Sequence, residues 1–386
     1  MISEIQLEQL LSEYSILVVG GDHYNTLATV RCLGRAKVPF GLLLHGSRAF
    51  EATRVSKSVY APQDGIAVGD SEESLVQAIS NWAESNSQSK QIVYTCSDHA
   101  ERIVEQHFPQ LLHPGFKKSE PRVLDLMNKR VQADWARALD IEVAREEVLD
   151  FSTEINCENV FKKYGHCIFK PVESALGAKA DIRFAEKESD VEDCVSFFMG
   201  ANYTSILVQQ FVDFDYELNA NGCVLGSGEI IWHLIKKEQI HPLQGGSLAY
   251  GVLENRAEIR EQVQAFLDKV ADCGYCGPFD IEFFVKGNSV SLNECNFRQS
   301  GLMFSIVERG VPLPLMWIAS LAFENVGEHV QLNSSHEESF ANERFLLASI
   351  VKREEKMALA LKRLIKAKHY AYWAKDDLRG SIAWYR

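Results

Sequence analysis

The sequence predicts a mixed fold, in which a doubly wound α/β domain is followed by an α+β region. One indication is the apolar run Ser15–Gly21, which ends in two glycines and precedes a helical pattern and a second apolar run. Another is a β-hairpin further along the chain, with strands at Phe279–Val285 and Ser289–Cys295 joined by Lys286-Gly287-Asn288. The 386 residues give room for two or three domains and an ample core.

Composition narrows the class of protein. Hydrophobic residues make up 46% and charged residues 24%, as is typical of globular proteins, and the net charge of −13 argues against a nucleic-acid partner. We find neither a signal-peptide pattern at the start nor an apolar run of about 18 residues, and the nine dispersed cysteines are typical of reduced thiols. We therefore expect a cytoplasmic protein without a membrane or nucleic-acid partner. The oligomeric state stays open, a homodimer included.

The N-terminal region continues as a strand–helix–strand unit, with a helix at Thr26–Ala36 and a strand at Pro39–His45. The glycines of Gly20-Gly21-Asp22-His23 do not form the GxGxxG pattern, so a dehydrogenase is disfavoured. Three further elements are predicted: a helix at Glu73–Glu84, a strand at Gln91–Thr95, and a helix that Ser97-Asp98 caps.

The middle of the chain contains two lysines in suggestive positions. Lys129 lies in a segment of helical spacing, Val123–Ala138, where a lysine on a solvated helix face is the ordinary interpretation. Lys170 closes a strand and is followed by a loop of small residues, Ser174–Ala180. A lysine and the bare N–H groups of such a loop suit a phosphate, although an exposed hairpin loop is the simpler alternative.

The apolar strand Ser205–Val212 comes next. Its residues from Gln209 to Val212 are able to present backbone groups to an adenine edge, and Glu217 is able to accept from ribose hydroxyls. A strand at Ile230–Ile235 is expected to lead into a loop over Lys236–Tyr250.

The hairpin carries the strongest chemical signal. Strand alternation places two sets of residues on one face each: Asp280, Glu282 and Phe284 on the first strand, and Leu292, Glu294 and Asn296 on the second. If the two faces coincide, Glu282 and Glu294 point into one space with Asn296 beside them and Arg298 just beyond. Two carboxylates and an amide oxygen suit Mg²⁺ in a nucleotide site, and an arginine suits a phosphoryl group. The alternative is a hairpin with a solvated charged face.

Two other patterns receive ordinary interpretations. Cys273-Gly-Tyr-Cys276 has CxxC spacing, but without a second pair a zinc or redox role is disfavoured. The basic amphipathic stretch Lys352–Lys368 is interrupted by Glu354 and Glu355, so we expect it to pack on the body of the protein.

Together these features resemble the ATP-grasp superfamily, in its carboxylate–amine ligase branch. The resemblance follows the chain in order: Asn128-Lys129 in a helix, a strand ending in Lys170-Pro171, a Q-Q-F-V…E stretch from Gln209, and the D-x-E…E-x-N-x-R hairpin. It implies a biotin-carboxylase-like domain at 1–115, an ATP-grasp domain of two lobes at 116–330 with a lid subdomain at about 160–210, and a C-terminal extension at 331–386 packed on the body.

The resemblance also implies roles for particular residues. For ATP, Lys129 and Lys170 would contact phosphates, the lid loop would include Ser174 and Gly177, adenine would lie beside Gln209, Gln210, Phe211 and Val212, and ribose would bind Glu217. Two Mg²⁺ ions, or Mn²⁺, would bind Glu282, Glu294 and Asn296, with Arg298 and Lys170 as the catalytic residues. The sequence departs from the family where N-P-R is common, since it has Asn296-Phe297-Arg298, and its lid loop has a single glycine.

The implied reaction joins a carboxylate to an amine, of an amino acid or small peptide, through an acyl phosphate. Two alternatives stay open, a carboxylase that uses bicarbonate and an ATP-binding regulator without chemistry. The sequence does not identify the substrates, but four segments are candidates for contacting them: Gly20–Asn25, Ser97-Asp98, Lys236–Ser247 and Arg298–Gly301.

Overall fold

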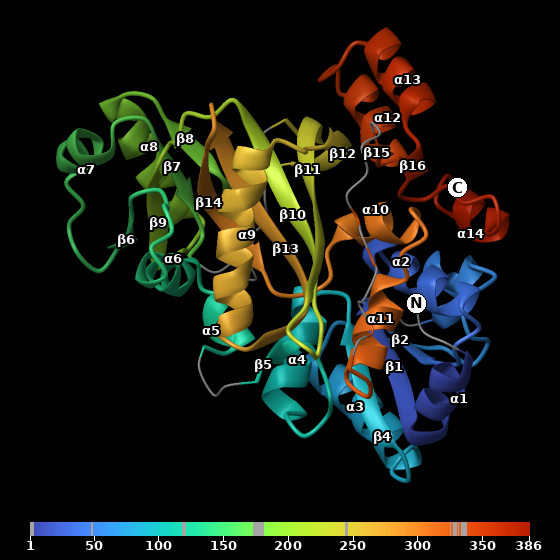
Figure 1. Ribbon diagram of the computed structural model, residues 1–386. Coiled ribbons are helices and arrows are strands. Elements are labelled where there is room, and N and C mark those ends of the chain that lie inside the picture. Colours follow the sequence, from blue (N-terminus) through green and yellow to red (C-terminus); the bar gives the residue numbers. More distant parts are fainter. Residues whose placement is uncertain are drawn as a thin grey trace.

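The computed structural model describes residues 4–47, 49–117, 121–172, 181–243, 246–324, 326, 330, 332 and 338–386. The described strands form three sheets, and the chain passes through them largely in order (Figure 1). None of the described helices has the length and apolar character needed to cross a membrane.

The first sheet is parallel, with strand order β3-β2-β1-β4. Its strands are β1 (Tyr14–Gly21), β2 (Gly41–His45), β3 (Ile66–Val68) and β4 (Lys90–Thr95). Its helices are α1 (Glu4–Glu13), α2 (Tyr24–Arg35), α3 (Glu72–Ser85) and α4 (Asp98–His107), with short 3-10 turns at Phe50–Ala52 and Val55–Lys57. Residues of α1 and α2 pack on one face and those of α3 and α4 on the other, so the predicted doubly wound arrangement is confirmed.

The second sheet is the largest, with order β14-β13-β10-β11-β12-β15-β16 and β5 paired to β13. Its strands are β5 (Gly115–Phe116), β10 (Tyr216–Val224), β11 (Ile230–His241), β12 (Ser247–Leu253), β13 (Tyr275–Lys286), β14 (Ser289–Asn296), β15 (Ser339–Ala341) and β16 (His369–Tyr370). Helix α9 (Ala257–Asp272) packs its apolar face on β10 and β13. The polar side chains of the central strands lie on the other face of this sheet.

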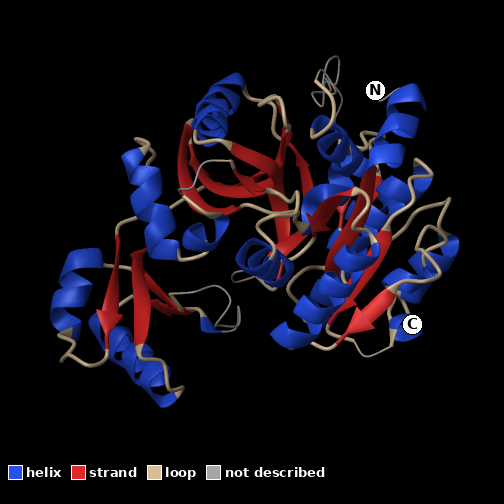
Figure 2. Ribbon diagram, turned by 90° about the horizontal axis from the view of Figure 1, so that it is seen from below, coloured by secondary structure: helices blue, strands red, loops and turns tan. Residues whose placement is uncertain are grey.

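The third sheet is small, with order β6-β9-β7-β8. Its strands are β6 (Glu146–Asp150), β7 (Cys167–Lys170), β8 (Arg183–Ala185) and β9 (Ser205–Gln210), packed against α7 (Cys157–Tyr164) and α8 (Glu188–Gly200). This lobe stands apart from the first sheet (Figures 1 and 2).

The remaining helices connect these parts. They are α5 (Val123–Leu126), α6 (Lys129–Ala138), α10 (Phe304–Val307), α11 (Leu313–Ser320), α12 (Glu343–Val351), α13 (Met357–Lys366) and α14 (Leu378–Ala383), with a 3-10 turn at Gly301–Met303. Helix α11 has no polar face and is buried among α2, β10 and β13, so one apolar core continues from the first sheet into the second.

The structure corrects three local predictions. The segment Val123–Ala138 is two helices, because the Asn128 side chain accepts the N–H groups of Arg130 and Val131 and so starts a new helix. The strand predicted at Ile230–Ile235 continues to His241 instead of becoming a loop at Lys236.

The third correction concerns the hairpin. Its pairing register shifts after Glu282, so that two residues of β14 oppose one of β13. Leu292 therefore faces the apolar core instead of sharing a face with Glu294 and Asn296.

Candidate active site

The hairpin brings the two predicted metal ligands together. Glu282 lies directly opposite Glu294 in the ladder, and Asp280 lies opposite Asn296. The carboxylates of an opposed pair repel each other unless cations neutralise them. Two lysines from other elements do so here.

Lys237 is the first of these lysines, and its contact with the carboxylates was not predicted, since the sequence placed it in a loop. Its ammonium group lies 2.9 Å from Glu217 Oε2 and 3.0 Å from Glu282 Oε2, with only 3% of its side chain exposed. Burial opposes the charge, but Glu282 and Glu217 together raise the pKa of Lys237 above its usual value. The alternation of side chains along β11 would have placed Lys237 on the face of Glu217 and Glu282. That alternation applies to Lys237 only if the strand is taken to continue past Ile235.

Lys129 is the second. It starts α6, and its Nζ lies 3.9 Å from Glu294 Oε1. Gln132, one turn later, donates to the carbonyl of Cys295 at 2.7 Å and accepts its N–H at 2.9 Å. This buried amide fastens α6 to β14 and thereby holds Lys129 at the carboxylates.

Lys170 lies across the same space on β7. Its Nζ donates to Gln209 Oε1 at 3.0 Å, and the Gln209 amide donates to Glu146 Oε2 at 2.8 Å. Burial, assisted by the charge of Lys129, lowers the pKa of Lys170 to about 8. Two lysines close together, one of them buried, attract a polyanionic ligand because its charge offsets their mutual repulsion. Glu146, whose pKa burial raises, had no signal in the sequence.

Arg298 is held by a residue of the first sheet. Its Nε and Nη2 donate to the two carboxylate oxygens of Asp98 at 2.7 and 2.9 Å, and Nη2 lies 3.4 Å from Asn296 Oδ1. Asp98 begins α4, at the carboxyl edge of the parallel sheet. The ion pair outweighs the effect of burial on both partners, raising the pKa of Arg298 and lowering that of Asp98.

Three of the four segments proposed to contact substrate meet at this point. Gln299 accepts from the Thr29 hydroxyl at 2.7 Å and donates to the carbonyl of Asn25 at 2.5 Å. A Cβ on Gly301 would lie 2.5 Å from the ring of Tyr24, so only glycine allows this close approach. The segments Gly20–Asn25, Ser97-Asp98 and Arg298–Gly301 are therefore neighbours in space.

Buried polar groups continue along the same sheet face. Asn219 donates to Asp280 Oδ1 at 2.6 Å, and Asn221 donates to Ser300 Oγ at 3.0 Å. Burial, together with the charge of Glu282, raises the pKa of Asp280 to about 6.

The predicted adenine residues are the last two of β9, Gln209 and Gln210, and the two that follow it, Phe211 and Val212. Gln210 and Phe211 donate their N–H groups to the carbonyls of Arg145 and His166. Gln209 points its side chain toward Lys170, as described above. The ring of Phe211 stacks on His166 with centroids 4.0 Å apart.

Further aromatic contacts follow along the chain between Val212 and Glu217, where it passes from the small sheet to the large one. Phe214 stacks on Phe284 of β13 with centroids 4.5 Å apart. This aromatic step joins the small sheet to the large one, and the spacing of the sequence did not predict it. Ser174 and Gly177 lie outside the described residues.

Two cavities adjoin at Lys129 and Gln132, which line both. One extends along Glu294, Asn296, Arg298 and Asp98, and the other along Glu146, Lys170, Gln209 and Asn293. Lys129, Lys170, Glu294 and Arg298 therefore line open space and are not enclosed in a solid core.

The oxygen ligands of the hairpin fit a metal ion that takes most of its other ligands from water and a bound phosphate. Among the described residues, no group of three or more His, Cys, Asp or Glu side chains has the geometry of a metal site. Glu282, Glu294 and Asn296 supply oxygen atoms on two facing strands, which suits Mg²⁺ that keeps waters and phosphate oxygens.

Comparison with known proteins assigns the fold. Residues 134–303 match the model of the ATP-grasp domain. The chain contains an ATP-grasp domain. The resemblance given by the Lys170 strand and the Glu282/Glu294 hairpin is thereby confirmed.

Solved structures extend the likeness over as much as 89% of the chain. N5-Carboxyaminoimidazole synthetase from Staphylococcus aureus aligns over 89% of this chain and 87% of its own, with TM-score 0.64 and 11% identity. Carboxyaminoimidazole ribonucleotide synthase from Aspergillus clavatus, solved with ATP, aligns over 86% and 82% with TM-score 0.65 and 14% identity. Phosphoribosylglycinamide synthetase from Anaerococcus prevotii gives 85% and 80%, TM-score 0.59 and 15% identity. At these identities the likeness establishes the fold.

One curated relative matches by sequence. Formate-dependent phosphoribosylglycinamide formyltransferase from Erythrobacter litoralis is 27% identical over 179 residues, which are 44% of this chain and 45% of that protein. The match thus spans less than half of the relative.

Proposed function

We propose that this protein is an ATP-dependent ligase that activates a carboxylate as an acyl phosphate and joins it to an amine, forming ADP and phosphate. The observation that carries the proposal is the position of Glu282 opposite Glu294, with four cationic side chains around them: Lys129, Lys170, Lys237 and Arg298. This arrangement places cations on both sides of a carboxylate pair, as phosphoryl transfer between two anions requires.

ATP would bind between the small sheet and the large one. Lys170 and Lys129 would contact phosphates, and both line the adjoining cavities. Adenine would lie at the end of β9, where Val212 offers a backbone N–H beside the stacked ring of Phe211. Glu217 would accept from ribose hydroxyls, sharing its charge with Lys237.

Glu282, Glu294 and Asn296 would hold Mg²⁺, as two ions, with Mn²⁺ as a substitute. When bound, the metal neutralises phosphate charge and orients the γ-phosphoryl group. Lys237 donates to Glu282 Oε2 at 3.0 Å and would hold this carboxylate in position for the metal.

The reaction would begin at Arg298. A carboxylate oxygen of the substrate attacks the γ-phosphorus while the bond from that phosphorus to the β–γ bridging oxygen breaks, which yields ADP and an acyl phosphate. The amine then attacks the acyl carbon, loses a proton to water or base, and expels phosphate. A carboxylate is already a competent nucleophile, so the chain needs no side chain to activate it.

Asp98 would act as a placeholder for that substrate. It binds Arg298 through both oxygens, which is the bidentate geometry that a substrate carboxylate would use. Because half of the Asp98 side chain is exposed, an incoming carboxylate is able to exchange with it. Through its ion pair with Arg298, Asp98 would also hold the start of α4, and with it the first sheet, next to the reacting groups.

The proposed domains would lie at 1–115, 116–330 and 331–386, with the lid subdomain at about 160–210. The substrates would be small molecules of the amino acid or peptide class. The nine cysteines are all free thiols, which suits the reducing cytoplasm.

The test is release of ADP and phosphate when candidate carboxylates are presented with candidate amines and Mg²⁺-ATP, with the product identified by mass spectrometry. Turnover that needs both partners supports the ligase. Bicarbonate-dependent turnover without an added carboxylate would instead indicate a carboxylase. ATP binding without turnover across a broad panel would indicate a regulator and reject the ligase.

A further inference from the structure

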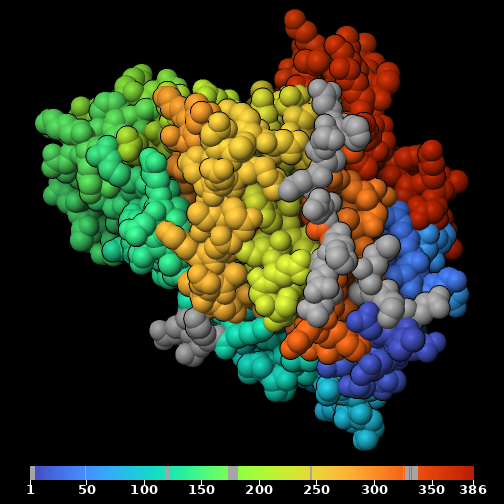
Figure 3. Space-filling model, in the orientation of Figure 1, coloured from blue at the N-terminus to red at the C-terminus, as the bar shows by residue number. Residues whose placement is uncertain are grey.

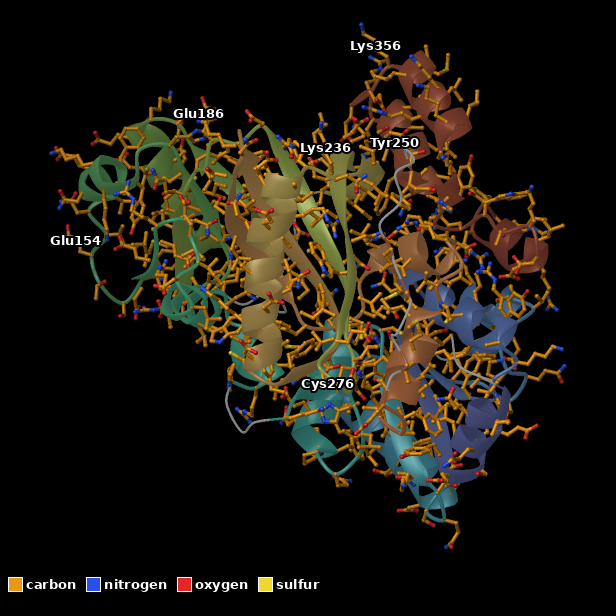
Figure 4. All side chains as sticks on the ribbon, viewed as in Figure 1. Glu154, Glu186, Lys236, Tyr250, Cys276 and Lys356 are labelled. Atoms are coloured by element: carbon orange, nitrogen blue, oxygen red, sulfur yellow. The ribbon has the colours of Figure 1, made fainter. Side chains whose placement is uncertain are left out.

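The C-terminal part of the chain forms a lobe that projects from the body (Figures 1 and 3). Helix α13 is at its outer end, and Lys356, just before this helix, reaches beyond the rest of the molecule in Figure 4. We call the exposed side chains of residues 351–368 the C-terminal basic surface.

One face of α13 anchors it. Leu364 packs with Ala367, Leu346 and Tyr250 in a small apolar cluster against α12 and the edge of the large sheet, and Ala360 on the same side of the helix is fully buried. The expectation that this stretch packs on the body is therefore correct for one face of the helix.

The neighbouring face of α13 is apolar and open to solvent. Met357, Leu361 and Ile365 follow each other at spacings of four and form one stripe. Met357 is 62% exposed and Ile365 is 84% exposed, as is Val351 at 81% just before the turn into α13. Large aliphatic side chains exposed at this level on a helix commonly mark an interaction surface.

The charges on the C-terminal basic surface all have one sign. Its six exposed charged side chains are Lys352, Arg353, Lys356, Lys362, Lys366 and Lys368. The two acids that interrupt the sequence pattern turn away from it. Glu354 lies 2.5 Å from His241 Nδ1, and Glu355 pairs with Arg363.

This inward pairing changes the interpretation of the sequence. In the sequence Glu354 and Glu355 lower the net positive charge of the stretch. In the folded protein both carboxylates form ion pairs inside the lobe and are largely buried. The remaining surface is uniformly basic on a chain whose net charge is −13. A charge separation of this kind orients the molecule in front of an anionic surface and turns its acidic body away.

We propose that the C-terminal basic surface docks this protein on an anionic membrane, with the apolar stripe of α13 inserted at the headgroup level and the lysines among lipid phosphates. An aliphatic stripe beside lysines is the composition of interfacial helices. The projecting lobe allows this contact to form before the acidic body approaches the lipid. The inference does not depend on the proposed ligase activity.

A second copy of the chain is a poorer occupant. A twofold dimer would place this surface against itself and bring six like charges toward six others. Nucleic acid is also disfavoured, because residues 351–368 lack an exposed aromatic ring on which bases stack.

The experiment is sedimentation of the full chain with vesicles of phosphatidylcholine containing 30% phosphatidylglycerol, compared with pure phosphatidylcholine. We expect binding to the anionic vesicles only, and its loss at high salt. Each basic side chain near such a surface contributes about fivefold to affinity. The double change Lys362→Glu with Lys366→Glu should therefore weaken binding at least about tenfold.

Two further variants separate the contributions. Ile365→Ser should weaken binding severalfold without changing the charge. The charge-matched control is Lys162→Glu with Lys163→Glu, on α7 in the opposite lobe, which should bind as the unmodified chain does.

Three results would overturn the proposal. One is no binding to anionic vesicles at low salt. Another is an equal loss of binding in the α7 control, which would indicate a general effect of net charge. The third is a dimer in sedimentation velocity that Ile365→Ser dissociates, which would assign the surface to a second copy.

Discussion

Two arginine–aspartate pairs connect the first sheet to distant parts of the chain, and they differ in how completely they are enclosed. Arg31 of α2 binds Asp377 near the C-terminus at 2.9 Å, and the two side chains are 1% and 0% exposed. Arg298 binds Asp98 at 2.7 Å, but half of the aspartate side chain is open to solvent.

The buried pair is saturated with further hydrogen bonds. Arg31 also donates to the carbonyl of Tyr372 at 2.7 Å, and Asp377 accepts from the Ser58 hydroxyl at 2.8 Å and the Val59 N–H at 3.0 Å. With no room for another ligand, this pair can only fasten the C-terminal segment to the first sheet. The open pair has the same chemistry but lines a cavity, so its arginine is able to exchange partners.

The comparison predicts that changes around the open pair affect activity, whereas changes in the buried pair affect stability. The largest effect is expected for Glu294→Gln, close to Arg298. Removing a ligand charge from the proposed Mg²⁺ site should lower kcat at least about 10³-fold, because a metal bound there would stabilise several kcal/mol of transition-state charge. Steady-state ADP release measures this loss.

Glu294→Gln should leave thermal unfolding within about 1 kcal/mol of the unmodified protein, since the site is polar and partly solvated. Glu261→Gln on α9, an exposed glutamate far from the cavity, is the matched control and should keep full activity. Near-normal turnover in Glu294→Gln would reject the metal assignment.

Next in size is Asp377→Ala, which leaves the buried Arg31 charge unpaired. We expect a loss of about 3–5 kcal/mol of unfolding free energy, measured by urea denaturation. Asp376→Ala is a close control, since the adjacent aspartate also binds an arginine, Arg35, but is 45% exposed. Its loss should be about 1 kcal/mol or less. Equal losses in the two variants would contradict the distinction drawn between enclosed and open pairs.

At the candidate active site, the charge of Lys170 should make kcat/KM for ATP depend on pH. Its lowered pKa of about 8 means that the free protein loses the Lys170 charge as the pH rises through 8, whereas an ordinary lysine keeps its charge to a much higher pH. We expect kcat/KM for ATP to be highest below pH 8 and to fall about tenfold per unit above it.

Lys170→Arg keeps its charge throughout this range and should flatten the fall, and Lys170→Ala should raise the KM for ATP at pH 7. A profile that is unchanged in both variants would show that Lys170 does not contact ATP. The unmodified profile measured with saturating ATP serves as the reference.

The smallest effect is expected for Asp98→Asn. An exposed ion pair contributes about 0–1 kcal/mol, so unfolding should change little. If Asp98 occupies the place of the substrate carboxylate, its loss should lower the KM of that substrate severalfold. A fall in kcat with unchanged KM would instead mean that Asp98 orients Arg298 for the reaction.

Much of this protein followed from the sequence because the relevant signals are local. The apolar run before Gly20 and Gly21 predicted a buried parallel strand, and strand alternation predicted that Glu282 and Glu294 point into one space if the two faces of the hairpin coincide. The register shift after Glu282, which the alternation did not predict, is what places Glu282 directly opposite Glu294. Glu294, Asn296 and Arg298 could be singled out because a period of two is visible in the letters themselves. The ATP-grasp fold was predicted from the resemblance of the ordered motifs to that superfamily, and not from periodicity alone.

Tertiary structure decided the parts that depend on distant partners. Lys237 was assigned to a loop because a strand continuing through polar residues has no apolar signal. Gln132 and Asp98 have their roles only because α6 and α4 happen to reach β14 and Arg298. No periodicity within a segment specifies which residue of another segment will satisfy its charge.

The same reason applies to the C-terminal basic surface. The sequence shows Glu354 and Glu355 among lysines, but burial of their carboxylates against His241 and Arg363 is a long-range event. The sequence by itself thus determined the strands, the hairpin chemistry and the class of nucleotide site. Which charges face one another, and which face solvent, was decided only by packing, because side-chain charges are neutralised through space and not along the chain.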